Sequence, residues 1–296
     1  MRHLKRIWVM TMTMALVVGF TSAAYATQTD LVPGNPVYLT LGDSWGYGQG
    51  ATDPATSGYA AVLAGTLAED LDCSPAQSEN AVDGCKHLQH LNLARGATET
   101  LPGVTAPIVA SEQLPVAIPM IEARNGDMNP ANDIEAITLH VGGNDVTGPI
   151  QAACIDGIDP TCVAVWMTEM AVFEADLQAV VAPLRSAAGD ETPIVLGTYD
   201  NPVATCWLFD AFGPEAVFLG AMLLEGSPGF VDGQLGVHLD GIHEVVRRVA
   251  SANGAQVAES FGTLDPGDFV GGSDCLHIRD SGHQKVAATF ATILED

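Results

Sequence analysis

Basic residues are scarce in this 296-residue chain, which has 11 lysines and arginines against 36 aspartates and glutamates. A surface with so few positive charges repels nucleic acids and anionic membranes. We therefore expect neither of them as a partner. The simplest explanation of the acidic excess is that it keeps the protein soluble. The excess alone identifies no substrate.

Three other features are also missing. No Cys-x-x-Cys pair occurs, so the cysteines do not suggest a common zinc site. No internal repeat or low-complexity linker divides the chain, which makes a single domain the simplest organisation. The apolar run at residues 7–20 is shorter than the about 20 residues that a membrane-spanning helix needs.

That apolar run belongs to a pattern typical of secretory signals. A basic start, MRHLKR, precedes it, and the segment ends in the small-residue sequence Ala24-Tyr25-Ala26. We expect cleavage after Ala26, a secreted protein and a single domain over residues 27–296. The alternative, an uncleaved membrane anchor, is disfavoured by the shortness of the run. No cysteine stands immediately after the cleavage site, so a bacterial lipid anchor is not indicated.

All six cysteines follow the predicted signal, and an even number in an exported chain predicts disulfides. Short loops close at low entropic cost, which favours Cys73–Cys85 and Cys154–Cys162. The remaining two would then form Cys206–Cys275. Other connectivities, such as one with a Cys85–Cys154 bridge, stay open.

Short apolar runs alternate with longer helical patterns. Strands are predicted at 36–41, 90–94, 135–141, 193–199 and 255–260, and helices at 57–71, 111–124, 163–187, 239–252 and 281–296. This alternation predicts an α/β fold with a parallel sheet covered on both faces. Ligands bind such sheets beyond the carboxyl ends of the strands. Ser44 follows the first strand and the cluster 142–145 follows the third, so both should lie at that edge.

Ser44 lies between glycines in LGDSWGYG, which makes it a candidate nucleophile. Near the C-terminus, Asp274 precedes His277 by three residues; His277 can accept the serine proton while Asp274 orients the ring. Asp-x-x-His also occurs by chance in many chains. A metal site formed by these two residues with Asp280 and His283 is a weaker alternative, because the spacing matches no common zinc site.

An acyl-transfer site also needs donors for the oxyanion. Gly96 follows the second predicted strand, and Asn144 lies in the cluster after the third. With the backbone N–H of Ser44 they would form a three-donor oxyanion hole, in which one donor is worth about 2.7–4 kcal/mol. Taken alone, Gly96 is most often a turn glycine.

Four short motifs in this order resemble the SGNH hydrolases, also called GDSL esterases and lipases. They are Gly42-Asp43-Ser44, Gly96, Gly142-x-Asn144-Asp145 and Asp274-x-x-His277, and the resemblance covers about residues 36–294. It implies a three-layer α/β/α sandwich with a mostly parallel five-stranded sheet, and the roles just described for these residues.

Within that family, the secreted six-cysteine layout is similar to that of actinobacterial lipases and esterases. Trp45 and Ile278 stand where the family commonly has leucine and proline. These departures affect the substrate range rather than the mechanism.

We therefore expect a secreted, monomeric hydrolase of carboxylic esters that works through an acyl-enzyme without cofactor or metal. Lipid or other acyl esters are favoured as substrates. The alternatives are a thioesterase or peptidase with the same triad, a carbohydrate deacetylase, and a non-catalytic lipid-binding module.

The segment 206–230 is strongly apolar and fits no clean period. It is either a helix packed in the core or a wall that holds an acyl chain. In the second case Phe218 and Leu223 would contact the chain, with Trp45 and Tyr47 on the facing side.

Overall fold

The computed structural model describes residues 31–70, 87–96, 104–127, 129–206, 214–272 and 274–295. The predicted signal, the cysteines of the predicted Cys73–Cys85 pair and the start of the apolar segment, 207–213, lie outside the described residues. The two other predicted bridges, Cys154–Cys162 and Cys206–Cys275, are present.

A five-stranded parallel sheet forms the centre of the fold, as predicted. Its strands are β1 (Val37–Gly42), β2 (Gln89–Asn92), β3 (Ile134–His140), β4 (Ile194–Gly197) and β5 (Gln256–Ala258), in the order β2-β1-β3-β4-β5. In the register, Leu39 of β1 lies between Leu91 and Ile137. These central strands are apolar because both faces of the sheet are covered by helices.

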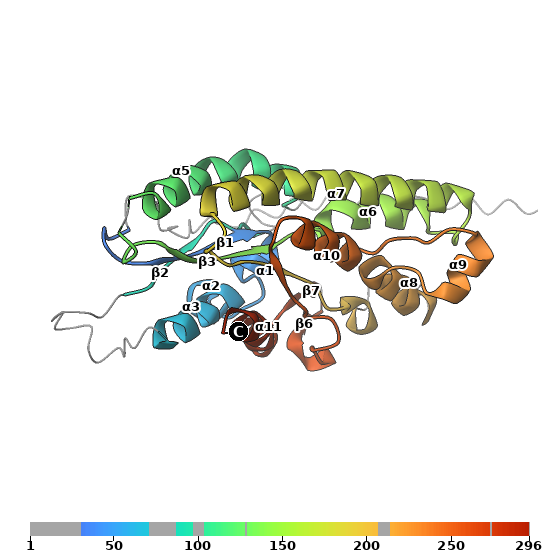
Figure 1. The fold of residues 1–296 in the computed structure, drawn as a ribbon. Helices are drawn as coiled ribbons and strands as arrows, with labels where there is room; N and C mark the ends of the chain where they lie inside the picture. Colours follow the sequence, from blue (N-terminus) through green and yellow to red (C-terminus); the bar gives the residue numbers. More distant parts are fainter. Residues whose placement is uncertain are drawn as a thin grey trace, which may run out of the picture.

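Helices cover the two faces of the sheet (Figure 1). One layer contains α5 (Leu114–Asn125) and α7 (Pro160–Ala188), with α6 (Gly143–Ala153) and α10 (Ile242–Ala252) packed against α7. The other contains α3 (Tyr59–Asp70) and α11 (Asp280–Leu294), which pack against each other. The predicted three-layer α/β/α sandwich is therefore confirmed.

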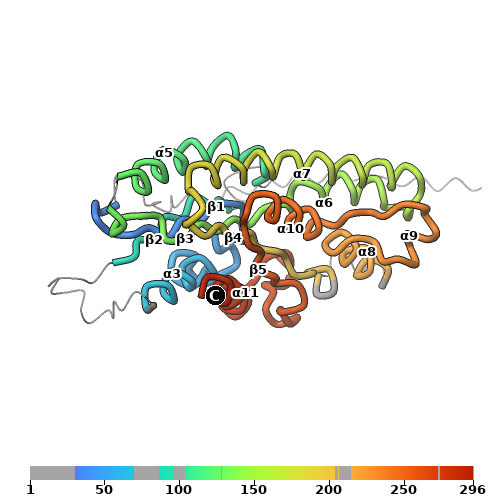
Figure 2. The backbone as a smooth tube through the Cα atoms, viewed as in Figure 1, coloured from blue at the N-terminus to red at the C-terminus, as the bar shows by residue number. Residues whose placement is uncertain are grey.

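The remaining helices and strands lie mostly around the ends of the sheet. They are α1 (Ser44–Tyr47), α2 (Pro54–Ser57), α4 (Ala106–Ile108), the π-helix η3 (Val109–Gln113), η4 (Pro202–Thr205), α8 (Pro214–Glu225), α9 (Gly229–Leu235), η6 (Pro266–Asp268), and the antiparallel pair β6 (Phe269–Gly271) and β7 (Asp274–Ile278). Figure 2 shows α8 and α9 beyond the carboxyl ends of the sheet strands. In the described part of the chain, no helix has the length and apolarity to cross a membrane.

Several details differ from the sequence-based expectation. The helix expected at 57–71 is present as α3 but begins at Tyr59, because Gly58, which separates it from α2, is extended, with φ −64° and ψ 149°. Helix α6 was not predicted. Strand β7, which carries Asp274 and His277 and pairs with β6, was not predicted either.

Candidate active site

Ser44 follows a tight turn at the end of β1. Gly42 has φ +124°, and a Cβ there would lie 2.1 Å from the backbone oxygen of His140, so only glycine fits. The Asp43 carboxylate accepts a hydrogen bond from the backbone N–H of Trp45 at 2.9 Å. This bond caps α1, whose first residue is Ser44.

A glutamine from a neighbouring helix holds the same turn. The Gln113 side chain accepts from the N–H of Gly42 and donates to its carbonyl, both at 2.8 Å. Gln113 is the last residue of the π-helix η3. π-Helical turns are rare in proteins overall, and many of those that occur lie at functional sites. The turn is thus held both by its own cap at Asp43 and by a side chain from η3.

The side chains of Ser44, His277 and Asp274 form a hydrogen-bonded line. His277 Nε2 lies 2.9 Å from Ser44 Oγ, and its Nδ1 lies 2.5 Å from Asp274 Oδ1. Because a carboxylate only accepts, Nδ1 carries the proton and Nε2 is free to accept from the serine hydroxyl. Ser44 is 6 % exposed, whereas the Asp274 side chain is 39 % exposed.

Strand β7, which carries both Asp274 and His277, is attached to the rest of the site at two points. The indole N–H of Trp45 donates to the carbonyl of Leu276 at 3.2 Å. The disulfide Cys206–Cys275 joins β7 to the residue that follows η4. These contacts hold β7 against the turn that carries Ser44.

Asn144 enters the site from the turn after β3. Gly142 has φ +136°, and a Cβ there would lie 2.7 Å from the ring of Phe173, so glycine is required. The Asn144 amide donates to the carbonyl of Val104 at 3.2 Å. An amide nitrogen has two hydrogens, so one N–H remains for a substrate.

Gly96 lies close to α1. The backbone N–H of Arg95 donates to the carbonyl of Gly42 at 3.2 Å, which brings this loop beside the serine turn. A Cβ on Gly96 would lie 3.1 Å from the Tyr47 ring. Gly96 is not among the residues that line the cavity at Ser44.

Two acidic residues near the serine carry buried carboxylate oxygens: Asp43 is 2 % exposed, and Asp145 is partly buried. Burial raises the pKa of Asp43 to about 6, although hydrogen bonds from Tyr199 and Trp45 lower it. Burial raises the pKa of Asp145 to about 7; one of its oxygens accepts from Ala106 N and the other is buried without a partner. These carboxyls favour the protonated form more than a surface carboxyl does.

A cavity of about 290 Å³ opens at the serine. Ser44, His277 and Asn144 line it, so the structure brings together three of the residues predicted from separate motifs. Much of its remaining surface is apolar, with contributions from Leu224 and Ile242. A small polar cluster in an apolar cavity is typical of a ligand site.

The structure separates the four predicted substrate contacts into two groups. Trp45 and Leu223 line the cavity. Tyr47 packs on Gly96, and Phe218 is 39 % exposed and stacks on Phe230 with 5.9 Å between ring centroids. In contrast to the expectation, neither Tyr47 nor Phe218 lines this cavity.

Two residues of the site were missed by the sequence-based reasoning. The hydroxyl of Tyr199 donates to Asp43 Oδ2 at 2.5 Å, and its ring lines the cavity. Tyr199 follows β4, so the rule that ligands lie at the carboxyl ends of strands could have identified it. Gln113 lies far from every motif in the sequence, and no local signal identifies it.

The weaker metal alternative involved Asp280 and His283. The carboxylate of Asp280 accepts from the backbone and the hydroxyl of Thr52. His283 is fully buried; Tyr59 N donates to its Nδ1, and its Nε2 lies 3.2 Å from the carbonyl of Gln49. These partners give both residues a structural role that is separate from Ser44.

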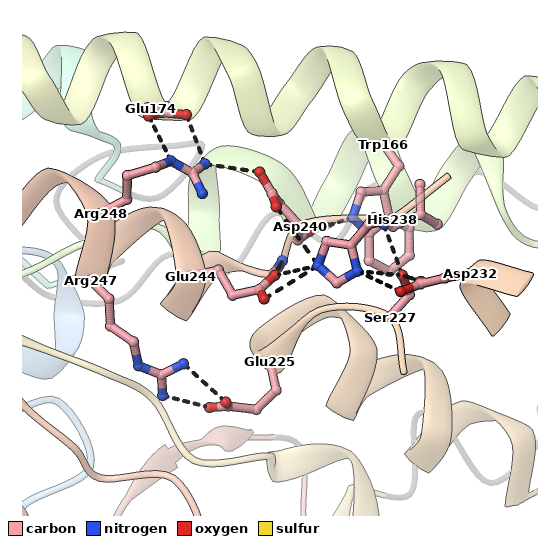
Figure 3. Close-up of polar contacts among 12 residues, drawn as sticks. Trp166, Glu174, Glu225, Ser227, Asp232, His238, Asp240, Glu244, Arg247 and Arg248 are labelled. Carbon is pink, nitrogen blue, oxygen red and sulfur yellow. Dashed lines mark hydrogen bonds and ion pairs between the residues drawn. The ribbon is translucent and has the colours of Figure 1, made fainter. Parts of the chain in front are cut away.

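One other cluster has ligand types suited to a cation. His238 Nε2 lies 3.0 Å from Glu244 and 3.8 Å from Asp240, while its Nδ1 lies 2.9 Å from Asp232 (Figure 3). The hydrogen bonds that the ring of His238 donates to Asp232, which has the larger effect, and to Glu244 raise the pKa of His238. Arg248 pairs with Asp240 at 2.8 Å. An ion-pair network joining α9 to α10 accounts for this cluster without a metal.

Comparisons with known proteins support the fold. No model of a known protein family matches the sequence, and no curated protein sequence does either. Among solved structures, an extracellular lipase from Streptomyces rimosus has a TM-score of 0.52 and 17% identity over 88% of this chain and 98% of its own. A lipase from a goat rumen metagenome has a TM-score of 0.54 and 13% identity, over 87% of this chain and 97% of its own.

An acetylxylan esterase from Geobacillus stearothermophilus is also similar, with a TM-score of 0.51 and 14% identity over 88% of this chain and 94% of its own. At such identities the likeness concerns the fold. The chain therefore has the fold of these lipases and esterases, and the fold expected from its resemblance to the SGNH hydrolases is confirmed.

Proposed function

We propose that this protein is an exported serine hydrolase that cleaves carboxylic esters through an acyl-enzyme. The observation that carries the proposal is the hydrogen-bonded line Ser44–His277–Asp274 at the edge of an apolar cavity. The similar lipases and esterases support a hydrolase on this fold.

In the first half of the reaction, Ser44 Oγ attacks the ester carbonyl and His277 Nε2 takes the hydroxyl proton. The tetrahedral intermediate collapses, the bond to the alcohol oxygen breaks, and His277 returns the proton to the departing alcohol. Asp274 holds the ring and stabilises its positive charge while the proton is on it. Water then repeats the sequence on the acyl-enzyme and releases the acid.

The developing oxyanion needs donors that are in place before the reaction. We propose the free N–H of the Asn144 amide and the backbone N–H of Ser44 as two of these donors, because both residues line the cavity. We propose the backbone N–H of Gly96 as the third donor, as the motif implies. Gly96 lies beside α1 and does not line the cavity, so its role as a donor needs a separate test.

The decisive experiment compares Ser44→Ala with wild type on nitrophenyl acetate. Ser44→Ala should lose several orders of magnitude in kcat, and a fluorophosphonate probe should label wild type at Ser44 and leave the variant unlabelled. Ser111→Ala, at an exposed serine, serves as the control and should behave as wild type. Near-normal turnover by Ser44→Ala, or labelling at another serine, would contradict the proposal.

Export is proposed from the signal pattern at residues 1–26, and the two disulfides support it. When the full chain is expressed in a host with a Sec pathway, active protein should accumulate outside the cytoplasm. The intact mass should match a chain that begins at Thr27. Retention in the membrane fraction at full mass would favour the anchor alternative instead.

A further inference from the structure

A second cavity lies next to the one at Ser44. It also has a volume of about 290 Å³, close to the lower end of the about 300–1,000 Å³ usual for small-molecule sites. Its walls are almost wholly apolar and include Ile150, Trp166 and Leu219. The two cavities share four lining residues, which are Thr147, Val203, Gly220 and Leu223.

Two helix faces form most of the second cavity. From α6 and its C-cap come Thr147, Ile150, Gln151 and Cys154, and from α8 come Ala216, Leu219, Gly220 and Leu223, with Glu215 beside them. Each set has the spacing i, i+3, i+4, i+7, which is one face of an α-helix. The apolar segment 206–230 thus contributes both to the core, through Met222 and Leu224, and to a cavity wall.

The order of these residues gives the cavity a direction. Thr147 at the start of the α6 face and Leu223 at the end of the α8 face line both cavities, whereas Cys154 and Ala216 line only the second. The second cavity therefore leads away from Ser44 along α6. From position 144 to position 154 an α-helix rises about 15 Å.

Local contacts fix the walls of the second cavity. A Cβ on Gly220 would lie 2.7 Å from Val203 Cγ2, so glycine lets α8 pack closely against η4. The indole N–H of Trp166 donates to the carbonyl of Asp240 at 2.8 Å, which satisfies its one polar group. The disulfide Cys154–Cys162 fixes the end of α6 to the start of α7.

We propose that the second cavity binds the acyl chain of the ester, so that the natural substrates are esters of medium-length or long fatty acids rather than acetates. This inference rests on the proposed ester hydrolysis at Ser44. The leaving alcohol must receive its proton from His277, which lines the first cavity only. The acyl chain, bonded to the same carbonyl carbon, extends on the side of Asn144 and α6.

The value of kcat/KM should therefore rise with the length of the acyl chain. Each methylene that leaves water for the cavity adds about fourfold to kcat/KM, or about 0.8 kcal/mol, until the cavity is full. Lengthening the alcohol of an acetate ester should give no such increase.

The test uses nitrophenyl acetate, butyrate, octanoate and laurate with wild type, Ala216→Phe and Val217→Phe. Ala216 lines the second cavity only, so a phenyl ring there shortens the space for the chain but leaves the site at Ser44 intact. Val217, the next residue on α8, is 39 % exposed and lines neither cavity, so Val217→Phe is the matched control.

We expect wild type and Val217→Phe to favour octanoate over acetate by at least about tenfold, given the gain for each methylene. Ala216→Phe should lose that preference and keep its acetate rate. If Ala216→Phe does not fold, Leu219→Ala, which enlarges the cavity, should shift the optimum toward laurate. A flat chain-length profile in wild type, or an unchanged profile in a folded cavity variant, would overturn the inference.

These outcomes are distinct from failure of the proposed function. If wild type hydrolyses no ester and is not labelled by a fluorophosphonate, the proposed function itself is wrong. Binding without turnover gives an independent readout: Ser44→Ala should bind dodecanoate in calorimetry, and Ser44→Ala combined with Ala216→Phe should bind it at least about tenfold more weakly.

Discussion

The indole N–H of Trp45 donates a hydrogen bond to the carbonyl of Leu276 at 3.2 Å. The residue after the candidate nucleophile is thereby tied to the residue before the candidate base. In the resemblance to SGNH hydrolases, Trp45 stood out because it replaces a leucine, which has no such donor. We therefore expect Trp45 to help position β7, in addition to lining the cavity.

Trp45→Phe keeps an aromatic ring but removes this donor. We expect kcat for nitrophenyl acetate to fall about tenfold, the equivalent of about 1.4 kcal/mol, because β7 and His277 lose one point of attachment. KM should change little. Trp166→Phe removes an indole hydrogen bond away from Ser44 and should keep the acetate rate. An equal loss in both variants would point to general destabilisation instead.

The buried carboxyl of Asp145 should make stability depend on pH. Its pKa rises from 3.8 to about 7 in the folded protein, so between these values the folded state binds more protons than the unfolded state. The contribution of Asp145 to stability therefore falls as the pH rises from about 4 to 7. Asp145→Asn removes this loss and should gain about 1–2 kcal/mol relative to wild type at pH 8, but not at pH 4.

Asp127 provides the opposite case for comparison. Hydrogen bonds from Asn132 and Asn129 lower the pKa of its exposed carboxyl, so its contribution is present at neutral pH and is lost on acidification. Asp127→Asn should therefore lower the melting temperature at pH 7 and have less effect at low pH. Thermal unfolding of both variants across this range is the measurement, and the same sign for both at pH 8 would contradict the prediction.

The two described disulfides should differ in their effects on stability and on activity. Cys206–Cys275 spans 69 residues and Cys154–Cys162 spans 8, so chain entropy predicts about 4 and about 2.5 kcal/mol of stabilisation. Replacing both cysteines of the longer bridge with alanine should also reduce acetate hydrolysis below the melting temperature, because β7 carries Asp274 and His277. The same change at the shorter bridge should spare acetate and weaken hydrolysis of long-chain esters. Identical activity profiles would contradict this division.

Leu223 and Phe218 test the wall of the cavity directly. Leu223 lines both cavities, whereas Phe218 is exposed on the other side of α8. Leu223→Ser should reduce octanoate hydrolysis far more than acetate hydrolysis, and Phe218→Ser should change neither by more than about twofold, as is usual at the surface. If Phe218→Ser lowered the octanoate rate as strongly, the chain would lie along another face of α8.

Much of the fold could be predicted because its signals are local. The five apolar runs became the five strands, and the glycines at 42 and 142 mark the turns that carry Ser44 and Asn144. The motifs were informative because parallel strands bring their carboxyl ends together whatever their distance in the sequence.

The unpredicted parts depend on contacts between distant residues. Helix α6 contains Pro149 and two glycines, which lower its intrinsic propensity, and its packing against α7 compensates. The sequence pattern does not show which face of α8 lines the cavity, because Phe218, Met222 and Leu224 make the other faces apolar too. No sequence pattern shows that Gln113 meets Gly42, because that contact joins residues 71 positions apart.

The candidate base and its supporting aspartate lie on a two-stranded ribbon outside the main sheet, and Cys206–Cys275 joins this ribbon to the residue that follows η4. While these thiols are reduced, the ribbon lacks this covalent tie. If the chain is exported as proposed, the tie forms only outside the reducing cytoplasm, and we expect hydrolysis of the producing cell's own esters to be weaker before that point.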